Sequence, residues 1–344
     1  MQDRKRRICG MLACCGMLVI ILDGKTALFS MQAGIMLCIQ TVIPALFPFF
    51  LLSGIVCGSL LGQPIKVFQP LSKFCRIPRG SETLLIIGLV SGYPVGAQLV
   101  TQAYQDGKLS RDTAKRMLGF CSNAGPAFIF GMLSPLFSKA SISWLLWCIQ
   151  IVGALLVSFL LPGNTQSVTT IKCREPITLQ KALKNAVKNM VTVCSWVIVF
   201  RLILGFFDRW FLWLLPVEAR VLVAGVLELS NGCVMLRELS QDGMRFILAS
   251  VMLSFGGLCV TMQTLSVTED LGCAGYFPGK ALQTLICLFL SCIAQTFLFS
   301  KDDIIFISPA VFLALGSLTV VYLYLLHRKK VVAFTGRMLY NTTK

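Results

Sequence analysis

Apolar stretches of about twenty residues recur along this chain and constrain its fold more than any other feature. Hydrophobic residues make up 56% of the 344 positions and charged residues only 13%, a balance too apolar for a soluble domain. A helix of roughly 20 apolar residues is long enough to cross a bilayer. The sequence therefore predicts an all-α polytopic membrane protein.

Eight segments are predicted to span the membrane, and two further segments are predicted to enter it and return as re-entrant hairpins. In this topology most of the 31 lysines and arginines lie on the side of the two termini. The positive-inside rule assigns that side to the cytoplasm, so we expect a multi-pass protein of the bacterial cytoplasmic membrane with both termini cytoplasmic. The predicted spans are Ile8–Leu22, Met31–Leu61, Met117–Phe137, Ser141–Pro162, Met190–Phe207, Phe246–Val267, Pro278–Phe299 and Ile304–Leu326, and the predicted hairpins are Ser81–Tyr104 and Phe211–Leu239.

The same segments divide the chain into two similar halves. Each half consists of a span, a hairpin, a broken span and a plain span, and three crossings per half give the halves opposite orientations, which makes an inverted repeat. Residues 105–116 are predicted to form a polar turn, and Pro44 and Pro48 to kink or break their helix. The predicted division is an N-terminal anchor helix at 1–30, a first repeat at 31–162, a cytoplasmic linker with an amphipathic helix at 163–189, a second repeat at 190–299, and a last span with a basic tail at 300–344.

Small and polar residues interrupt the apolar segments at four places, two in each half. The first half contains Ser91-Gly92-Tyr93-Pro94-Val95-Gly96-Ala97 and Ser122-Asn123-Ala124-Gly125-Pro126, and the second contains Glu228-Leu229-Ser230-Asn231-Gly232 and Ser254-Phe255-Gly256-Gly257. Each unsatisfied peptide group in hydrocarbon costs several kcal/mol, so such breaks are tolerated only inside protein or beside a cavity. Paired breaks in two halves predict a binding site between the repeats. The alternative is a set of closely packed hairpin tips that bind nothing.

Three side chains are the strongest individual candidates at these breaks. Asn123 offers both a donor and an acceptor, although polar residues in spans also join helices by hydrogen bonds. Glu228 is an acid at membrane depth, which predicts a functional group; the alternative is a structural ion pair with Arg220, Arg237 or Arg201. Gln263 follows Gly256 by two helical turns. The candidate substrate-binding residues are Ser91, Gly92, Tyr93, Pro94, Gly96, Ser122, Asn123, Gly125, Glu228, Ser230, Asn231, Gly232, Ser254, Gly256, Gly257 and Gln263.

Several classes of function lack the residues they need. The net charge of +16 comes without a basic run interleaved with aromatic residues, so nucleic-acid binding is not expected. The 15 cysteines form no CxxC pair and no cluster with histidine, so no metal site is expected. The single histidine, His327, lies at a membrane edge, and most hydrolytic mechanisms lack their usual base. We therefore expect neither an enzyme nor a cofactor, apart from H⁺ or Na⁺ as a coupling ion.

The paired motifs resemble those of a known group of membrane proteins. The run 91–97 with Phe120–Ile129 is similar to the nucleoside-recognition "Gate" domain of concentrative nucleoside transporters and of the ferrous iron transport protein B, and Leu227–Gly232 with Ser254–Gln263 matches in the second half. Among proteins with this domain, the chain most resembles the YlbJ family of sporulation integral membrane proteins of spore-forming Firmicutes. The resemblance runs from about residue 30 to residue 326. It implies an inverted-repeat membrane fold and a role in spore formation, and it does not identify the solute.

Two functions follow from these observations as expectations. The first is a transporter that moves a small polar solute, nucleoside-like or other, through a site between the hairpins, with Glu228 as the group that couples transport to H⁺. The second is a non-transporting membrane scaffold needed for spore assembly. The expected partners are membrane lipids, the solute, and either further copies of the chain or sporulation membrane proteins.

Overall fold

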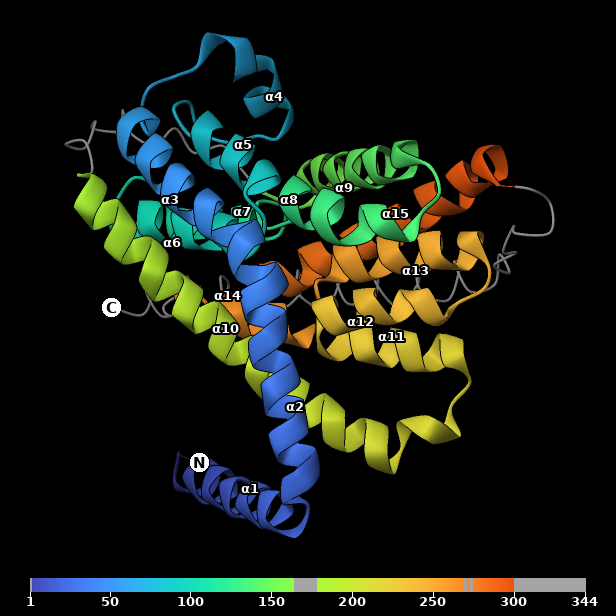
Figure 1. The fold of residues 1–344 in the computed structure, drawn as a ribbon. Helices are drawn as coiled ribbons and strands as arrows, with labels where there is room; N and C mark the ends of the chain where they lie inside the picture. Colours follow the sequence, from blue (N-terminus) through green and yellow to red (C-terminus); the bar gives the residue numbers. More distant parts are fainter. Residues whose placement is uncertain (1, 164–177, 269–270, 273–274, 300–344) are drawn as a thin grey trace, which may run out of the picture.

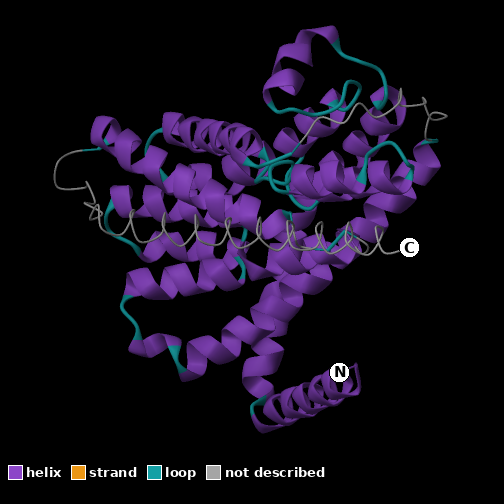
Figure 2. Cartoon of the chain, turned by 180° about the vertical axis from the view of Figure 1, so that it is seen from behind, coloured by secondary structure: helices purple, strands orange, loops and turns teal. Residues whose placement is uncertain are grey.

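Every regular element is helical in the part of the chain that the computed structural model describes, which comprises residues 2–163, 178–268, 271–272 and 275–299 (Figures 1 and 2). The helices in chain order are α1 Gln2–Leu22, α2 Gly24–Leu37, α3 Ile43–Leu60, α4 Gln69–Phe74, α5 Glu82–Val90, α6 Val95–Gln105, α7 Arg111–Leu118, α8 Pro126–Phe128, α9 Ala140–Leu160, α10 Leu179–Trp210, α11 Val217–Leu227, α12 Leu229–Met235, α13 Asp242–Phe255, α14 Gly257–Thr268 and α15 Tyr276–Leu298. Short π-helical turns (Cys38–Val42 and Ile129–Leu133) and 3₁₀ turns (Lys66–Phe68, Ser134–Leu136, Leu212–Leu214 and Leu236–Glu238) connect or extend them. The prediction of an all-α protein is confirmed.

Five helical segments of the described chain are long and apolar enough to cross a bilayer. Many of their large apolar side chains face outward, for example Phe297, which is 86% exposed, and such surface is stable only against lipid. The chain is therefore a multi-pass membrane protein. The five segments are Gly24–Leu60, Ala140–Leu160, Leu179–Trp210, Asp242–Thr268 and Tyr276–Leu298.

Of the other three predicted spans, two contain no apolar helical segment long enough to cross a bilayer, and the third lies outside the described residues. In α1 the apolar part is only Ile8–Leu22, because the preceding turn holds Arg4, Lys5, Arg6 and Arg7; at 1.5 Å per residue it covers about 22 Å of a roughly 30 Å hydrocarbon core. The predicted span Met117–Phe137 contains only the short apolar helix Pro126–Leu136. The predicted span Ile304–Leu326, the basic tail and most of the linker at 163–189 lie outside the described residues.

Helices α2 and α3 pack against α10, and α9, α13 and α15 form a second packed group. Helix α2 continues through a π-helical turn at Cys38–Val42 into α3, which starts just before Pro44 and keeps Pro48 inside it. The helix therefore continues past both prolines. Prolines and π-helical turns commonly bend a helix without ending it. Helix α10 runs unbroken for 32 residues, so the amphipathic linker helix and the span predicted separately are one element. Helices α2 and α3 cross α10 along much of its length (Figure 1).

Each half contains a helical hairpin followed by a broken helix. Helices α5 and α6 pack against each other, as do α11 and α12, at the positions where the sequence predicts re-entrant hairpins. After the first hairpin, the non-helical segment 119–125 separates α7 from α8; after the second, a break at Gly256 separates α13 from α14. Whether the hairpins re-enter the membrane, and whether the two halves are inverted, remain predictions from the sequence.

The predicted polar turn at residues 105–116 is wrong in its second half, because Arg111 to Leu118 form helix α7. Ser110 caps this helix by accepting a hydrogen bond from the Thr113 amide at 3.3 Å. The buried guanidinium of Arg116 donates to the carbonyls of Cys75 (2.7 Å), Arg76 (3.0 Å), Leu161 (3.2 Å) and Ser158. These carbonyls lie at the C-terminal ends of α4 and α9, where carbonyls have no partner within the helix. One arginine thus joins three helices, which a polar stretch of sequence does not reveal.

Candidate functional site

The first hairpin turns through a glycine in the left-handed region. Helix α5 ends where the Ser91 amide donates to the Ile87 carbonyl at 2.7 Å, and Gly92 follows with φ +83°, a conformation that glycine adopts without strain. A cis peptide bond joins Tyr93 to Pro94, after which α6 begins. A side chain on Gly125 would lie 2.9 Å from the Gly92 amide nitrogen. The turn of the hairpin therefore lies directly against the break in the following helix.

The segment 119–125 packs directly against the hairpin, and two glycines make room for it. A Cβ on Gly88 of α5 or on Gly96 of α6 would overlap the carbonyl of Cys121. Small residues allow this close backbone approach between membrane helices. The break predicted at Ser122–Pro126 is thus longer than expected, because the backbone stays non-helical from Gly119 to Gly125 while it packs against the hairpin.

The second hairpin repeats this arrangement with different residues. Gly225 of α11 and Gly232 of α12 face each other, and a Cβ on Gly232 would overlap the Cα of Gly225. Gly256 (φ +82°) and Gly257 (φ +78°) form the break between α13 and α14. A Cβ on Gly257 would lie 2.8 Å from the Gly225 carbonyl oxygen. In this half too, the break of the helix lies against the break of the hairpin.

Glu228 begins α12 as its N-cap. Its carboxylate accepts from the Ser230 amide at 3.1 Å and from the Asn231 amide at 2.7 Å, and the Asn231 side chain adds a third bond of 2.7 Å. Amides in the first turn of a helix have no partner within it, and a side-chain oxygen at the N-cap satisfies them. The carboxylate is 1% exposed, so water does not supply these bonds.

The ion pair considered for Glu228 does not form within the described chain. The Arg220 guanidinium lies 3.8 Å from both Asp208 and Glu238. Glu228 has no arginine or lysine within 4.0 Å among the described residues. The carboxylate is thus held by helix amides and an asparagine, an environment that stabilises it without a neighbouring cation.

Tyr93 connects the two halves. Its hydroxyl donates to the Leu253 carbonyl near the end of α13, one of the carbonyls left free by the end of that helix. Its ring lies against Gly256, where an added Cβ would sit 3.5 Å from two ring carbons. The turn of the first hairpin is therefore fixed to the break of the second half's helix.

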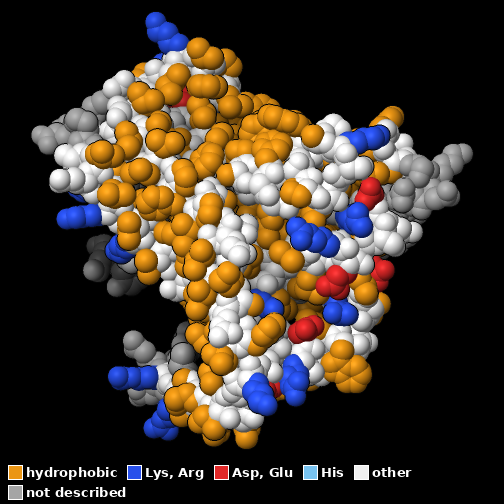
Figure 3. Space-filling model, in the orientation of Figure 1, with side chains coloured by type: hydrophobic (Ala, Val, Ile, Leu, Met, Phe, Trp, Pro, Cys, Tyr) orange, Lys and Arg blue, Asp and Glu red, His pale blue; other side chains and the backbone are white. Residues whose placement is uncertain are grey.

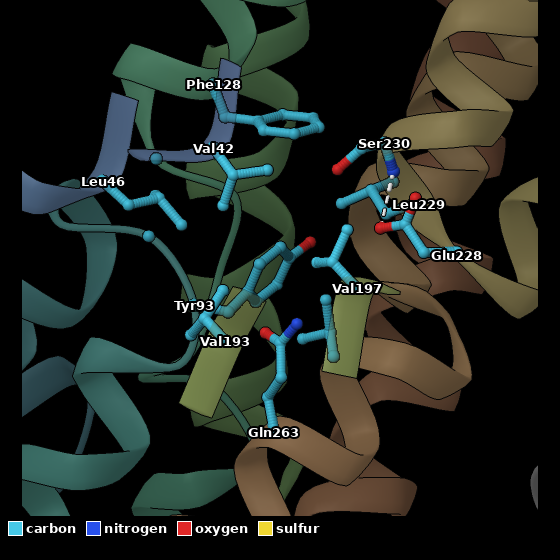
Figure 4. Close-up of a pocket in the computed structure, with 13 residues that line it drawn as sticks. Val42, Leu46, Tyr93, Phe128, Val193, Val197, Glu228, Leu229, Ser230 and Gln263 are labelled. Carbon is cyan, nitrogen blue, oxygen red and sulfur yellow. Dashed lines mark hydrogen bonds between the residues drawn. The ribbon is translucent and has the colours of Figure 1, made fainter. Parts of the chain in front are cut away.

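Three of the four breaks line one small cavity between the halves, and helix α14, which follows the fourth break, completes its wall. Its volume is about 30 Å³, enough for roughly one water molecule. Glu228, Ser230, Gln263 and Tyr93 surround it with polar groups (Figure 4), and the Gly92 and Gly125 backbones complete the lining. The remaining wall is apolar and comes from Val42, Leu46, Phe128, Val193, Val197, Leu229 and Val260.

Six of the sixteen predicted site residues line this cavity, and the other ten lie outside its lining, in the hairpins and breaks. Asn231 and Gly232 support the Glu228 cap, and Gly256 and Gly257 form the neighbouring break. Ser254 donates back to the Ser250 carbonyl at 2.8 Å and does not face the cavity. Ser91, Pro94 and Gly96 belong to the first hairpin, next to the lining residues. Ser122 is buried, and its hydroxyl has no hydrogen-bond partner among the described residues.

Asn123 lies outside the cavity lining, in a polar network with α15. Its side-chain oxygen accepts from Gln283 at 2.8 Å and from Lys280 at 3.4 Å, and its amide donates to the Phe120 carbonyl at 2.7 Å. Lys280 also donates to Gln283 at 2.8 Å and lies over the Tyr93 ring at 5.4 Å. The interhelical role considered for Asn123 is therefore the one observed, and the network reaches the cavity through Tyr93.

Lys280 and Gln283 were missed as site residues although both lie in the predicted span Pro278–Phe299, because the count of basic residues that set the orientation assigned Lys280 to the cytoplasmic loop before that span. Helix α15 begins at Tyr276, earlier than expected, and both side chains are fully buried (1% and 0% exposed). Their spacing of three residues, which places two polar groups on one helix face, is the signal that could have revealed them.

The comparisons with known proteins support a membrane protein of this kind. No family model matches the chain, and no solved structure matches it. The chain is similar to the sporulation integral membrane protein YlbJ of Bacillus subtilis (strain 168), with 24% identity over 299 residues that cover 73% of each protein. This similarity supports the resemblance to the YlbJ family and the assignment as an integral membrane protein; it does not extend to the Gate domain or to nucleoside recognition.

Proposed function

We propose that the protein moves a small polar solute across the membrane through the small cavity between the halves. The observation that carries the proposal is a convergence: three interruptions and helix α14, far apart in the sequence, enclose one cavity lined by Glu228, Ser230 and Gln263. Interrupted helices that meet between two halves are the usual construction of a transporter site. The carboxylate and the amide would accept and donate hydrogen bonds to hydroxyl or amino groups of the solute.

The aromatic lining favours a solute with a flat ring, such as a nucleoside. Tyr93 and Phe128 both line the cavity, and aromatic side chains stack on planar rings. We therefore place nucleoside-like compounds first among the candidates, while amino acids and dicarboxylates remain in the set to be tested. Proton or sodium coupling through Glu228 belongs to the same proposal.

The described conformation corresponds to the closed state of such a transporter. Pockets for small molecules measure about 300 Å³ or more, whereas this cavity holds about 30 Å³. The solute would enter when the hairpins separate from the opposite half, and the bond between Tyr93 and the Leu253 carbonyl is the contact that such a motion would break.

A scaffold without transport activity is the second candidate. The small volume of the cavity and the full set of hydrogen bonds on Glu228 favour it, because neither requires a ligand. The similarity to a sporulation integral membrane protein leads us to propose a link to spore formation for either function. The two candidates differ in whether water ever reaches the cavity.

Chemical labelling of a single cysteine distinguishes the two. In a background freed of the 15 native cysteines, we expect Ser230→Cys to react with a water-soluble thiol reagent in membranes, because a transporter must open its site to water in each cycle. Ser250→Cys is the matched control: Ser250 is buried beside Ser291, at 2.7 Å, and should stay unmodified. If Ser230→Cys remained as inert as the control, the scaffold would be the better account.

A further inference from the structure

A second, larger cleft lies between the start of α2 and the end of α10. Its volume is about 500 Å³, and its lining includes Lys25 and Ser30 of α2 and Arg201, Asp208 and Arg209 of α10. Figure 3 shows basic and acidic side chains gathered in the lower right part of the face, whereas the upper left is largely apolar. This cleft is separate from the cavity between the hairpins and shares no lining residue with it.

Arg201 is the residue of the cleft that most needs a partner. It lies about 14 Å before the end of α10, at 1.5 Å per residue, within an apolar span. Its stem packs on Gly34 of α2, where an added Cβ would be 3.2 Å from the Arg201 Cβ. The guanidinium forms no hydrogen bond or ion pair with any described residue. An arginine inside a span is costly and is usually paired.

The partners expected for Arg201 are engaged elsewhere. Asp208, two helical turns further along α10, attracts Arg201 electrostatically from a distance but lies within 4.0 Å of Arg220 only, at 3.8 Å. Arg209 uses its Nε to bind Asp23 at 2.9 Å, which leaves its two terminal nitrogens available. Lys25 forms no ion pair among the described residues. The cleft therefore offers three cationic groups against the single lining carboxylate of Asp208, an excess that suits an anion.

Aromatic side chains place the mouth of the cleft at the membrane surface. Trp213 lines it and is 65% exposed, and Trp210 and Phe211 beside it are 41% and 55% exposed. Exposed tryptophans of this kind mark the level of lipid headgroups. Phe29 lines the same cleft and is 69% exposed, so an apolar surface on α2 leads from the cationic groups along the membrane-facing side of the helix.

We propose that this cleft binds the phosphate of an anionic phospholipid, with Arg201 and Lys25 as its main ligands and the free nitrogens of Arg209 at its mouth. Arginine binds phosphate through a planar pair of donors, and basic pockets between transmembrane helices suit lipid headgroups. The acyl chains lie along Phe29 and the neighbouring apolar surface of α2. The lipid neutralises Arg201 inside the span and holds α2 against α10.

Lipid-dependent thermal unfolding of the full-length protein in detergent tests this assignment. We expect phosphatidylglycerol to raise the unfolding midpoint of the wild type, and phosphatidylcholine and inorganic phosphate to leave it unchanged. Arg201→Met, which keeps an unbranched apolar stem and removes the guanidinium, should weaken phosphatidylglycerol binding about tenfold or more, as the loss of a charge-assisted contact predicts. Lys25→Gln, at an exposed position that folding does not require, should weaken it to a smaller extent.

Lys139→Met is the matched control, because Lys139 is an exposed lysine outside the cleft; its phosphatidylglycerol dependence should equal that of the wild type. If Arg201→Met does not fold, the comparison of Lys25→Gln with Lys139→Met decides the question. Unchanged binding in the Arg201 and Lys25 variants, or equal losses in the Lys139 control, would overturn the site. Stabilisation by inorganic phosphate as large as that by the lipid would overturn the assignment of a lipid as the source of the phosphate.

Discussion

Replacing Gly96 with alanine should destabilise the protein by about 3 kcal/mol or more, because the added methyl group would overlap the Cys121 carbonyl. Neither partner can move freely. Gly96 lies in α6, and Cys121 belongs to the backbone segment that packs against the hairpin, so relief of the overlap must push the two segments apart. Thermal unfolding of the purified protein, followed by tryptophan fluorescence, measures the loss.

Gly54→Ala is the matched control for this substitution. Gly54 lies inside α3, and an added Cβ there would be 4.0 Å from the Ala182 side chain, an ordinary contact. Alanine is a better helix former than glycine by about 1 kcal/mol, so this variant should be as stable as the wild type or more so. Equal stability of Gly96→Ala and Gly54→Ala would show that segment 119–125 does not pack against Gly96 as described.

Replacing Glu228 with alanine should have the second large effect, a loss of about 4 kcal/mol of stability. The change leaves the amides of Ser230 and Asn231 without acceptors, and the Asn231 side chain loses its bond as well. A buried donor without a partner costs about 1–3 kcal/mol. The loss of an exposed N-cap costs only about 1 kcal/mol, and burial raises the cost here because water cannot replace the carboxylate.

Glu228→Gln removes the negative charge but keeps one side-chain oxygen that can cap α12. One side-chain oxygen remains to accept from the helix amides, so this variant should lose less than half as much stability as Glu228→Ala in the same unfolding assay. If the alanine variant were no less stable than the glutamine variant, the carboxylate would not cap α12, and its burial would need another explanation.

The positions of the breaks could be predicted from the sequence, because glycine, proline and asparagine in an apolar segment have local effects on the backbone. Gly92 and Gly256 adopt positive φ at the positions where an interruption was expected. The presence of Glu228 in the site could be predicted from the cost of an acid at membrane depth, but its capping role depends on where α12 begins.

Contacts between distant segments could not be predicted in the same way. The contact of the Cys121 carbonyl with Gly88 and Gly96, the Lys280–Gln283–Asn123 network and the four carbonyls bound by Arg116 join residues that are far apart in the chain. Charge counts also misplaced Lys280, since a lysine near the end of a span looks like a loop residue until the helix start is known. Helix α10 was divided for a similar reason, because its polar first turns and its apolar remainder differ in composition although the backbone is continuous.

Ligand-induced thermal stabilisation tests most directly whether the cavity between the hairpins is a solute site. Nucleosides, bases, amino acids, dicarboxylates and metal ions would be screened against the wild type and Glu228→Gln. A ligand at 100 times its dissociation constant adds about 2.7 kcal/mol of stability. We expect a nucleoside-like compound to stabilise the wild type and to lose this effect in Glu228→Gln. Stabilisation by none of these classes, in a protein that unfolds cooperatively, would contradict the account.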